Sequence, residues 1–229
     1  NPPPTVLGAF QVAGADVAGC PLDDRVYEIG RVVAVLFSEE VTAASVQDRL
    51  PESQITAFTS PGNRIVSVAL QPGGRVAYLA LREPVGPFVP SSVVVNGVTD
   101  QSGNALAGPV TLPIVTTVGT EAGVVSGRVK NADGTAAAGA IVRMFYEFNC
   151  GPDQNVVGVA EDVADATGAY RFDYVLNAPA MTVRLQVIDP ATNDLRNVRF
   201  KLARSGQQLN VDVVMLGRGI LTGRTLAED

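Results

Sequence analysis

The stretch RIVSVALQPGGRVAYLAL (residues 64–81) places two apolar runs on either side of a Pro-Gly-Gly sequence. Val and Ile have branched Cβ atoms, which suit the pleated surface of a β-strand. Glycine supplies the positive φ that many tight turns require. The stretch therefore predicts two strands, 64–70 and 75–81, joined by a turn at 72–74.

Similar runs recur through the first half of the chain at roughly ten-residue spacing, a pattern typical of an antiparallel sandwich. The other expected strands are TVLGAFQ (5–11), RVVAVLF (31–37), SVVVNGV (92–98) and VTLPIVTTV (110–118). One short helix is expected within 38–50, with Ser45 as its N-cap. Residues 1–118 are therefore predicted to form one sandwich domain.

A second series of strands follows residues 119–122, which have no pattern and predict a linker. In one of these strands Phe172 and Tyr174 share a face and Arg171 and Asp173 share the other, as strand alternation requires. The insertion at 149–164 is expected to be a loop. The expected strands are 124–130, 140–148, 168–176, 181–189, 195–203 and 208–216.

The chain also repeats itself, because GVVSGRVKNAD (123–133) is matched by GILTGRTLAED (219–229). Gly127-Arg128 aligns with Gly223-Arg224. The predicted fold is therefore all-β, with two tandem antiparallel β-sandwich (Ig-like) domains, 1–118 and 123–216, and an orphan strand in 217–229. That strand is either the first strand of a further repeat or a donor strand. For strand addition the candidates are Ile220, Leu221, Thr222 and Gly223.

Composition excludes several classes of function. The chain has 229 residues, a formal net charge of −6, and neither His nor Trp. Without His, a Ser-His-Asp or Cys-His catalytic site is impossible. The basic residues do not cluster, so no nucleic-acid partner is expected. No apolar run approaches the roughly 18 residues of a membrane span, and the opening NPPPTV is not a signal peptide.

Two acidic stretches are candidate cation sites. Asp100 and Asn104 lie in TDQSGNAL, where Asp, Asn and Gly also form turns without any ligand. Glu161, Asp162 and Asp165 lie close together in GVAEDVAD, where a solvated loop is the simpler interpretation. Calcium needs six to eight oxygen ligands, more than either stretch shows. No cofactor is expected, and Ca²⁺ stays open as an alternative at both places.

Two cysteines and two tyrosines complete the candidates. Cys20 and Cys150 are either isolated thiols or an inter-domain disulfide, which would require an oxidising compartment. Tyr146 and Tyr170 are the aromatic residues to consider for carbohydrate binding, which needs exposed rings.

Residues 3–118 contain the segments VVAVLFSEEVTAASV (32–46) and VVVNGVTDQSGNAL (93–106). Through these segments the first half resembles the bacterial Ig-like domains of S-layer and other surface proteins, although Val41 directly follows Glu40 where the family has Pro.

The second half, 123–216, contains the segments VSGRVKNADGTAAAGAIVRM (125–144), DATGAYRFDYV (165–175) and QQLNVDVVML (207–216). In these segments it resembles the carboxypeptidase regulatory-like domain, a transthyretin-like sandwich. The insertion at 149–164 and the segment LNAPAMTV depart from that pattern.

Both resemblances imply a non-enzymatic protein located outside the cell or on its surface. The expected function is a structural spacer within a larger protein, with further domains of the same polypeptide or neighbouring copies as partners. Two alternatives stay open: a filament subunit joined by strand addition, and an adhesin module that binds a ligand or carbohydrate.

Overall fold

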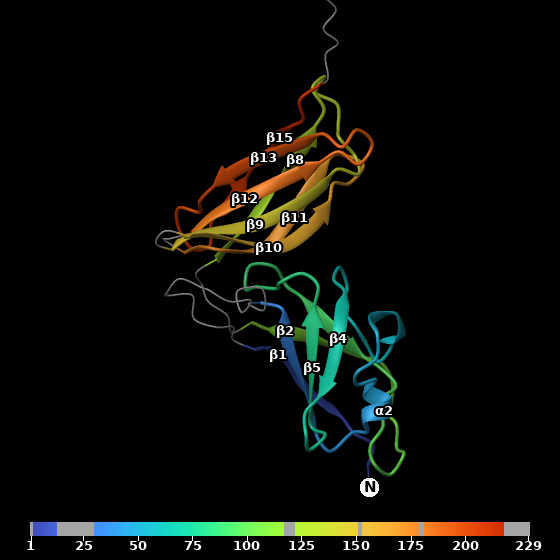
Figure 1. Cartoon of the computed structure of the whole chain (residues 1–229). Helices are drawn as coiled ribbons and strands as arrows, with labels where there is room; N and C mark the ends of the chain where they lie inside the picture. The colour runs from blue at the N-terminus through green and yellow to red at the C-terminus, as the bar shows by residue number, and fades with distance from the viewer. Residues whose placement is uncertain (1, 13–29, 117–121, 151–152, 179–180, 218–229) are drawn as a thin grey trace, which may run out of the picture.

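The computed structural model describes residues 2–12, 30–116, 122–150, 153–178 and 181–217. The chain forms two β-sandwiches stacked end to end, with the first and last described residues at opposite ends (Figure 1). The predicted all-β fold with two sandwiches is confirmed. No helix in the described part of the chain is long and apolar enough to cross a membrane.

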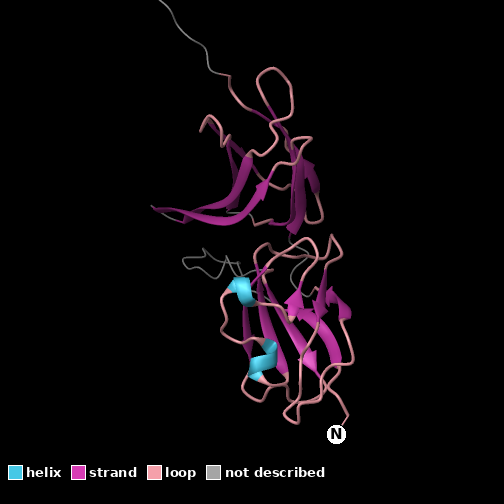
Figure 2. Cartoon of the chain, turned by 90° about the vertical axis from the view of Figure 1, so that its right-hand side faces the viewer, coloured by secondary structure: helices cyan, strands magenta, loops and turns pink. Residues whose placement is uncertain are grey.

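Within its described residues, the N-terminal sandwich has seven strands and two short helices; Figure 2 shows the helices in cyan. The strands are β1 (Val6–Gln11), β2 (Val32–Phe37), β3 (Phe58–Thr59), β4 (Ile65–Leu70), β5 (Val76–Leu81), β6 (Ser92–Val95) and β7 (Val110–Val115). Their order is β3-β6-β7-β1-β2-β5-β4. Strand β1 pairs antiparallel with β2 and parallel with β7, so it joins the two layers.

The predicted hairpin is β4 and β5, which pair antiparallel. Alternate residues of β5 point into the core: Ala77 and Leu79 are fully buried, whereas Tyr78 is 37% exposed. The short helix α2 (Ala43–Val46) begins one turn earlier than expected. Its N-cap is Thr42 and not Ser45, because the Thr42 side chain accepts a hydrogen bond from the Ser45 N–H.

The part of the C-terminal sandwich that the structure describes has eight strands in two layers, β10-β9-β12-β13 and β11-β8-β14, with β15 also paired to β8. The strands are β8 (Ala122–Lys130), β9 (Ile141–Cys150), β10 (Asp153–Val163), β11 (Ala169–Leu176), β12 (Met181–Ile188), β13 (Leu195–Phe200), β14 (Gln208–Asn210) and β15 (Val213–Val214). Strand β8 begins at Ala122, the last residue of the expected linker.

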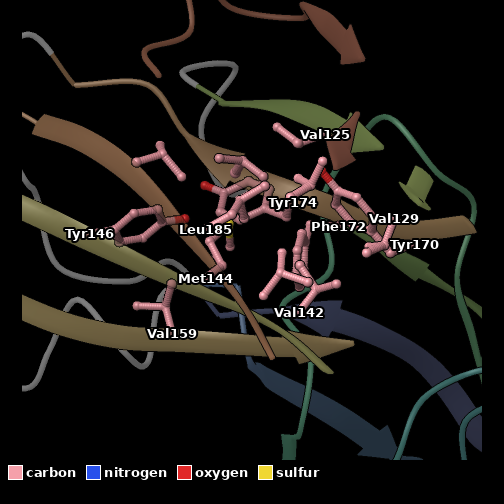
Figure 3. Close-up of a cluster of buried hydrophobic side chains, with 14 of the residues drawn as sticks. Val125, Val129, Val142, Met144, Tyr146, Val159, Tyr170, Phe172, Tyr174 and Leu185 are labelled. Carbon is pink, nitrogen blue, oxygen red and sulfur yellow. The ribbon is translucent and has the colours of Figure 1, made fainter. Parts of the chain in front are cut away.

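The interior of this sandwich is aromatic and aliphatic (Figure 3). Phe172 and Tyr174 are buried as the alternation predicted, and Arg171 is exposed. Met144 of β9 and Leu185 of β12 are fully buried in the same cluster. Burial of such side chains contributes about 1.5–3 kcal/mol each.

One expected loop is a strand. Residues 149–164 include the end of β9 and all of β10, and the two strands pair from Ile141 to Cys150 of β9. The pairing continues past a bulge between Gly158 and Ala160. The expectation of a loop was wrong because the backbone ladder with β9 holds this polar segment as an edge strand.

Candidate functional site: the junction between the sandwiches

A close contact across the junction is made by Tyr174 of β11. Its ring lies against the backbone of Gly86, so near that a Cβ on Gly86 would collide with it. The ring also lies beside Gly30, where φ is +81°. Tyr174 is 2% exposed and belongs to the C-terminal core, so the N-terminal sandwich docks directly on that core.

The loop that carries Gly86 is fixed from both sides. Phe88, two residues further on, packs against the C-terminal core. On the N-terminal side, the buried side-chain amide of Gln11 donates hydrogen bonds to the carbonyl oxygens of Gly30 and Val85. Val85 in turn donates its N–H to Gly30 at 2.9 Å. The docking surface is therefore part of the N-terminal sandwich and not a loose loop.

An arginine–glutamate chain crosses the junction. Glu161 of β10 accepts a hydrogen bond from Nε of Arg143 at 2.7 Å, and Nη2 of Arg82 from the N-terminal sandwich lies 3.8 Å from the same carboxylate. These side chains are 32–44% exposed, so each pair contributes at most about 1 kcal/mol. Their geometry nevertheless favours one relative orientation of the two sandwiches.

Glu83 is a titratable group at the junction whose pKa is raised. Burial at the junction raises the pKa of Glu83 to about 7, although the positive charges of Arg31 and Arg82 and a hydrogen bond from the Glu161 backbone act in the opposite direction. The nearby carboxylate of Asp162 raises it further. Groups from both sandwiches thus set the proton affinity of Glu83.

A cavity of about 260 Å³ lies beside this contact. Residues of both sandwiches line it, including Asn63, Glu83, Asp162, Arg171 and Tyr174. No group of three or more His, Cys, Asp or Glu side chains in the described residues could hold a metal ion. The arrangement is suited to mechanical coupling of two domains, with one carboxyl that titrates near neutral pH.

Of the residues expected as candidate sites, Asp100 and Asn104 lie in a turn far from the junction. Asp100 is 1% exposed, and its carboxylate accepts hydrogen bonds from Ser102 N–H, Asn104 N–H and the Asn104 side chain, each at 2.8 Å. Gly103 has a φ of +84°. The turn geometry therefore already engages both carboxylate oxygens.

The three acidic residues expected in one loop are divided between β10 and the turn after it. Glu161 faces Arg143, whereas Asp162 accepts hydrogen bonds from the backbone N–H groups of Val163 and Arg171. Asp165 closes the following turn by accepting from Thr167 and Ala169, and these bonds lower its pKa. The structure gives each carboxylate its own protein partners.

Tyr146 and Tyr170, the aromatic residues considered for carbohydrate binding, are core residues and offer no exposed ring. Tyr146 is 2% exposed and its hydroxyl accepts a hydrogen bond from the Leu176 N–H. Burial raises the pKa of Tyr146 to about 12. Tyr170 is 3% exposed and donates to the Val211 carbonyl at 2.6 Å.

The remaining candidates cannot be placed. Cys20 and the segment Ile220–Gly223 lie outside the described residues, and of Cys150 only the backbone, at the end of β9, is described. The disulfide and the strand addition therefore stay predictions.

Sequence reasoning did not identify the junction. Gly86 and Tyr174 are 88 residues apart, and the sequence of neither segment indicates that the other is near. The segment REPVGPFVP (82–90) is dense in Pro and Gly. Such a density predicts a loop, but it does not indicate that another domain docks there.

No protein-family model and no curated protein matches the sequence. Among solved structures, the N-terminal part of the bacterial S-layer protein SbsC is similar over 86% of this chain and 43% of that chain, with 13% identity and a TM-score of 0.37. The major pilin subunit BcpA of Bacillus cereus is similar over 80% of this chain and 63% of that one, with 12% identity and a TM-score of 0.28. The chain spans less than half the length of the S-layer chain, and at these TM-scores the similarities carry no argument about function.

Proposed function

We propose that the chain is a non-enzymatic structural segment of a larger protein, in which two β-sandwiches form a stiff spacer. The observation that supports it is the contact of Tyr174 with Gly86. Tyr174 belongs to the hydrophobic core of the C-terminal sandwich, and its ring contacts the backbone of the N-terminal sandwich. A flexible tether would need no such contact, because domains move relative to one another by default unless their interface is well packed.

The proposal places the spacer outside the cell or on its surface. The resemblances to bacterial Ig-like and carboxypeptidase regulatory-like domains support that location, and the assignment of 123–216 to the second family is part of the proposal. The partners are further domains of the same polypeptide or neighbouring copies.

Small-angle X-ray scattering of the full chain tests stiffness. A stiff spacer gives one narrow distribution of interatomic distances that a single arrangement of the two sandwiches reproduces. A broad distribution that requires an ensemble of inter-domain angles would contradict the proposal.

A second candidate function rests on the repeat of β8. A Cβ at Gly127 would collide with the Val211 carbonyl oxygen, and one at Gly123 with the Gln207 carbonyl oxygen, because β14 and the chain after it run beside β8. In the repeated segment these two positions are Gly223 and Gly219. The segment 219–229 therefore has the steric requirements of a β8-like central strand, which supports a role in a further sandwich or as a donor strand.

Light scattering over a wide concentration range, with the same sample imaged by electron microscopy, separates these roles. Fibres that disappear in a Thr222→Pro variant, which loses a strand N–H, would favour strand addition. A chain that forms no fibres would favour the further sandwich.

A further inference from the structure

A groove of about 460 Å³ lies where the N-terminal sandwich meets β9 and β10. It is next to the cavity beside Tyr174 and shares Glu83 and Glu161 with it. The N-terminal sandwich contributes side chains from β4 and from the segments before β2 and after β5, and the C-terminal sandwich contributes side chains from β9 and β10. The volume of the groove is within the range of about 300–1,000 Å³ that is typical of small-molecule sites.

The charges in the groove are unbalanced. Three arginines, Arg31, Arg82 and Arg143, line it together with two carboxylates, Glu83 and Glu161. The groove therefore has one positive charge in excess, although the whole chain has a net charge of −6. The raised pKa of Glu83, about 7, keeps this carboxyl partly protonated at neutral pH and increases the excess. Such a groove attracts a small anion, because its walls concentrate the field of the charges that line it.

Two of these arginines can offer N–H groups to a ligand. Arg143 donates from Nε to Glu161 at 2.7 Å. Nη2 of Arg82 lies 3.8 Å from Glu161 and its Nε lies 3.8 Å from Glu83, and both distances are longer than a hydrogen bond. A guanidinium has five N–H donors in a fork that matches a carboxylate. Arg82 can therefore bind a second carboxylate beside the one that Arg143 already holds.

An aromatic ring lies beside these charges. Phe145 of β9 is partly exposed and is paired in the sheet with Arg184 of β12 on one side and Gly158 of β10 on the other. The Arg184 guanidinium lies over the ring, 4.5 Å from its centre. On the β10 side a Cβ at Gly158 would stand 3.2 Å from a ring carbon of Phe145. Because residue 158 is glycine, this side of the ring stays open to the groove.

We propose that the groove binds a sugar ring that carries a carboxylate, such as a uronic acid unit of an acidic polysaccharide. Arginines only donate hydrogen bonds and ionised carboxylates only accept them, whereas hydroxyl groups do both, so a ring with several hydroxyls matches both kinds of lining group. The C–H face of the sugar packs on Phe145 above Gly158. The sugar carboxylate binds Arg82 and compensates the excess positive charge.

Other classes of ligand fit the groove less well. A neutral sugar leaves the excess positive charge without a counter-charge. A small carboxylate such as acetate pairs with Arg82 but does not use the Phe145 ring. A lipid or an apolar peptide needs a continuous apolar surface, whereas charged side chains lie among the apolar ones in this lining.

The sugar would contact both sandwiches, because Arg82 belongs to one and Phe145 to the other. A ligand that binds only the docked arrangement stabilises that arrangement. The inference adds attachment to a polysaccharide to the proposed spacer function. The stiffness of the spacer, measured by scattering without sugar, does not depend on it.

Titration of the isotope-labelled full chain, followed by NMR spectroscopy, tests the proposal. Galacturonic acid should shift the amide signals of Arg82, Phe145 and Glu161 with a Kd of about 1–10 mM, the order expected for a single small ring. Galactose has a similar ring without the carboxylate, and acetate has the carboxylate without the ring, so each should bind at least about tenfold more weakly. Unchanged signals with galacturonic acid up to about 50 mM, or an equal response to galactose or acetate, would overturn the proposal.

Two variants and a control locate the site. Arg82→Ala should weaken the binding of galacturonic acid by about tenfold or more, the size of one charge-assisted hydrogen bond. Arg75→Ala is the matched control and should bind like the wild type, because Arg75 is an exposed arginine before β5 whereas Arg82 follows that strand. Phe145→Leu keeps an apolar side chain but removes the flat ring, and it should weaken the binding by about two- to tenfold without changing that of acetate.

The Phe145→Leu variant is decisive, because Arg82→Ala also removes an ion pair between the sandwiches. Its scattering curve without sugar should match that of the wild type, which shows that the chain is folded and the junction is closed. Weaker binding of galacturonic acid by this variant then reports the contact with the ring. If the variant binds galacturonic acid as tightly as the wild type, the sugar does not lie on Phe145 and the proposal is wrong.

Discussion

The Tyr174 ring of the C-terminal sandwich rests on the backbone of Gly86 in the N-terminal sandwich, with no room between them for a Cβ. Two domains that contact each other only through long polar side chains can reorient at little cost. A ring that belongs to one core and covers a glycine of the other domain cannot move without exposing apolar surface. This relationship makes the junction the feature of the molecule most open to test by mutation.

A Gly86→Ala substitution should loosen the junction. The backbone of Gly86 does not have a positive φ, so alanine is tolerated locally, but its Cβ would overlap the Tyr174 ring. Overpacking of this kind costs about 1–3 kcal/mol of stability. Separation of the two sandwiches would remove the overlap. The scattering curve should then require several inter-domain angles. Gly108→Ala is the matched control, because no atom lies within 4 Å of a Cβ there; if both variants stay as compact as the wild type, the contact does not hold the junction.

The Asp100 turn should depend on its carboxylate and not on calcium. Asp100→Ala removes three hydrogen bonds at a buried site, and we expect a loss of about 2–3 kcal/mol in the free energy of unfolding, measured in urea. Adding calcium or a chelator should leave the melting temperature unchanged, since both carboxylate oxygens already accept hydrogen bonds. A rise of several degrees with calcium would show a cation site, because a ligand of the native state must stabilise it.

Most of the strands could be predicted from the sequence because apolar alternation is a local signal. The strand pair 64–70 and 75–81 is β4 and β5, shortened by one residue at each start. Strand β10 was missed because Asn, Gly and acidic residues interrupt its alternation, and what holds it is pairing with β9. A two-residue strand such as Phe58–Thr59 is too short to leave a pattern.

The candidate site was harder to predict because it is formed by segments that are far apart in the sequence. Nothing near Glu83 in the sequence indicates its raised pKa, and two of the groups that act on that pKa, Glu161 and Asp162, belong to the other sandwich. The alternation correctly placed Tyr174 on the same face as Phe172, but the sequence does not show that its ring reaches the neighbouring domain.

Gly127 should be the glycine on which the C-terminal sandwich depends most. A Cβ there would meet the Val211 carbonyl, which is backbone and is also the acceptor of the Tyr170 hydroxyl. Gly127→Ala must push β8 and the chain at Val211 apart, and we expect a loss of about 3 kcal/mol or more. Gly158→Ala is the comparison, because its Cβ would approach only the Phe145 ring at 3.2 Å. Equal urea midpoints for the two variants would contradict the close approach at β8.

Stability should depend on pH through Glu83. Its pKa is raised from 4.5 to about 7 at the junction, so the folded chain binds the proton more tightly than the unfolded chain. The stabilisation is complete below about pH 4.5 and is lost as the pH rises through about 7. The Glu83 side chain is 32% exposed, and after allowing for solvent screening we expect about 1–2 kcal/mol between pH 5 and 8.

The melting temperature should therefore fall by a few degrees between pH 5.5 and 8, and inter-domain distances from scattering should broaden over the same range. The Gln side chain of Glu83→Gln does not titrate in this pH range. The fall in melting temperature and the broadening of the distances should therefore both be much smaller in that variant. Glu40 is an exposed carboxylate that follows β2, whereas Arg31 precedes that strand at its opposite end. Glu40→Gln should therefore retain the wild-type dependence on pH. If Glu83→Gln melts with the same pH dependence as the wild type, the titrating group lies elsewhere and the junction does not respond to pH through Glu83.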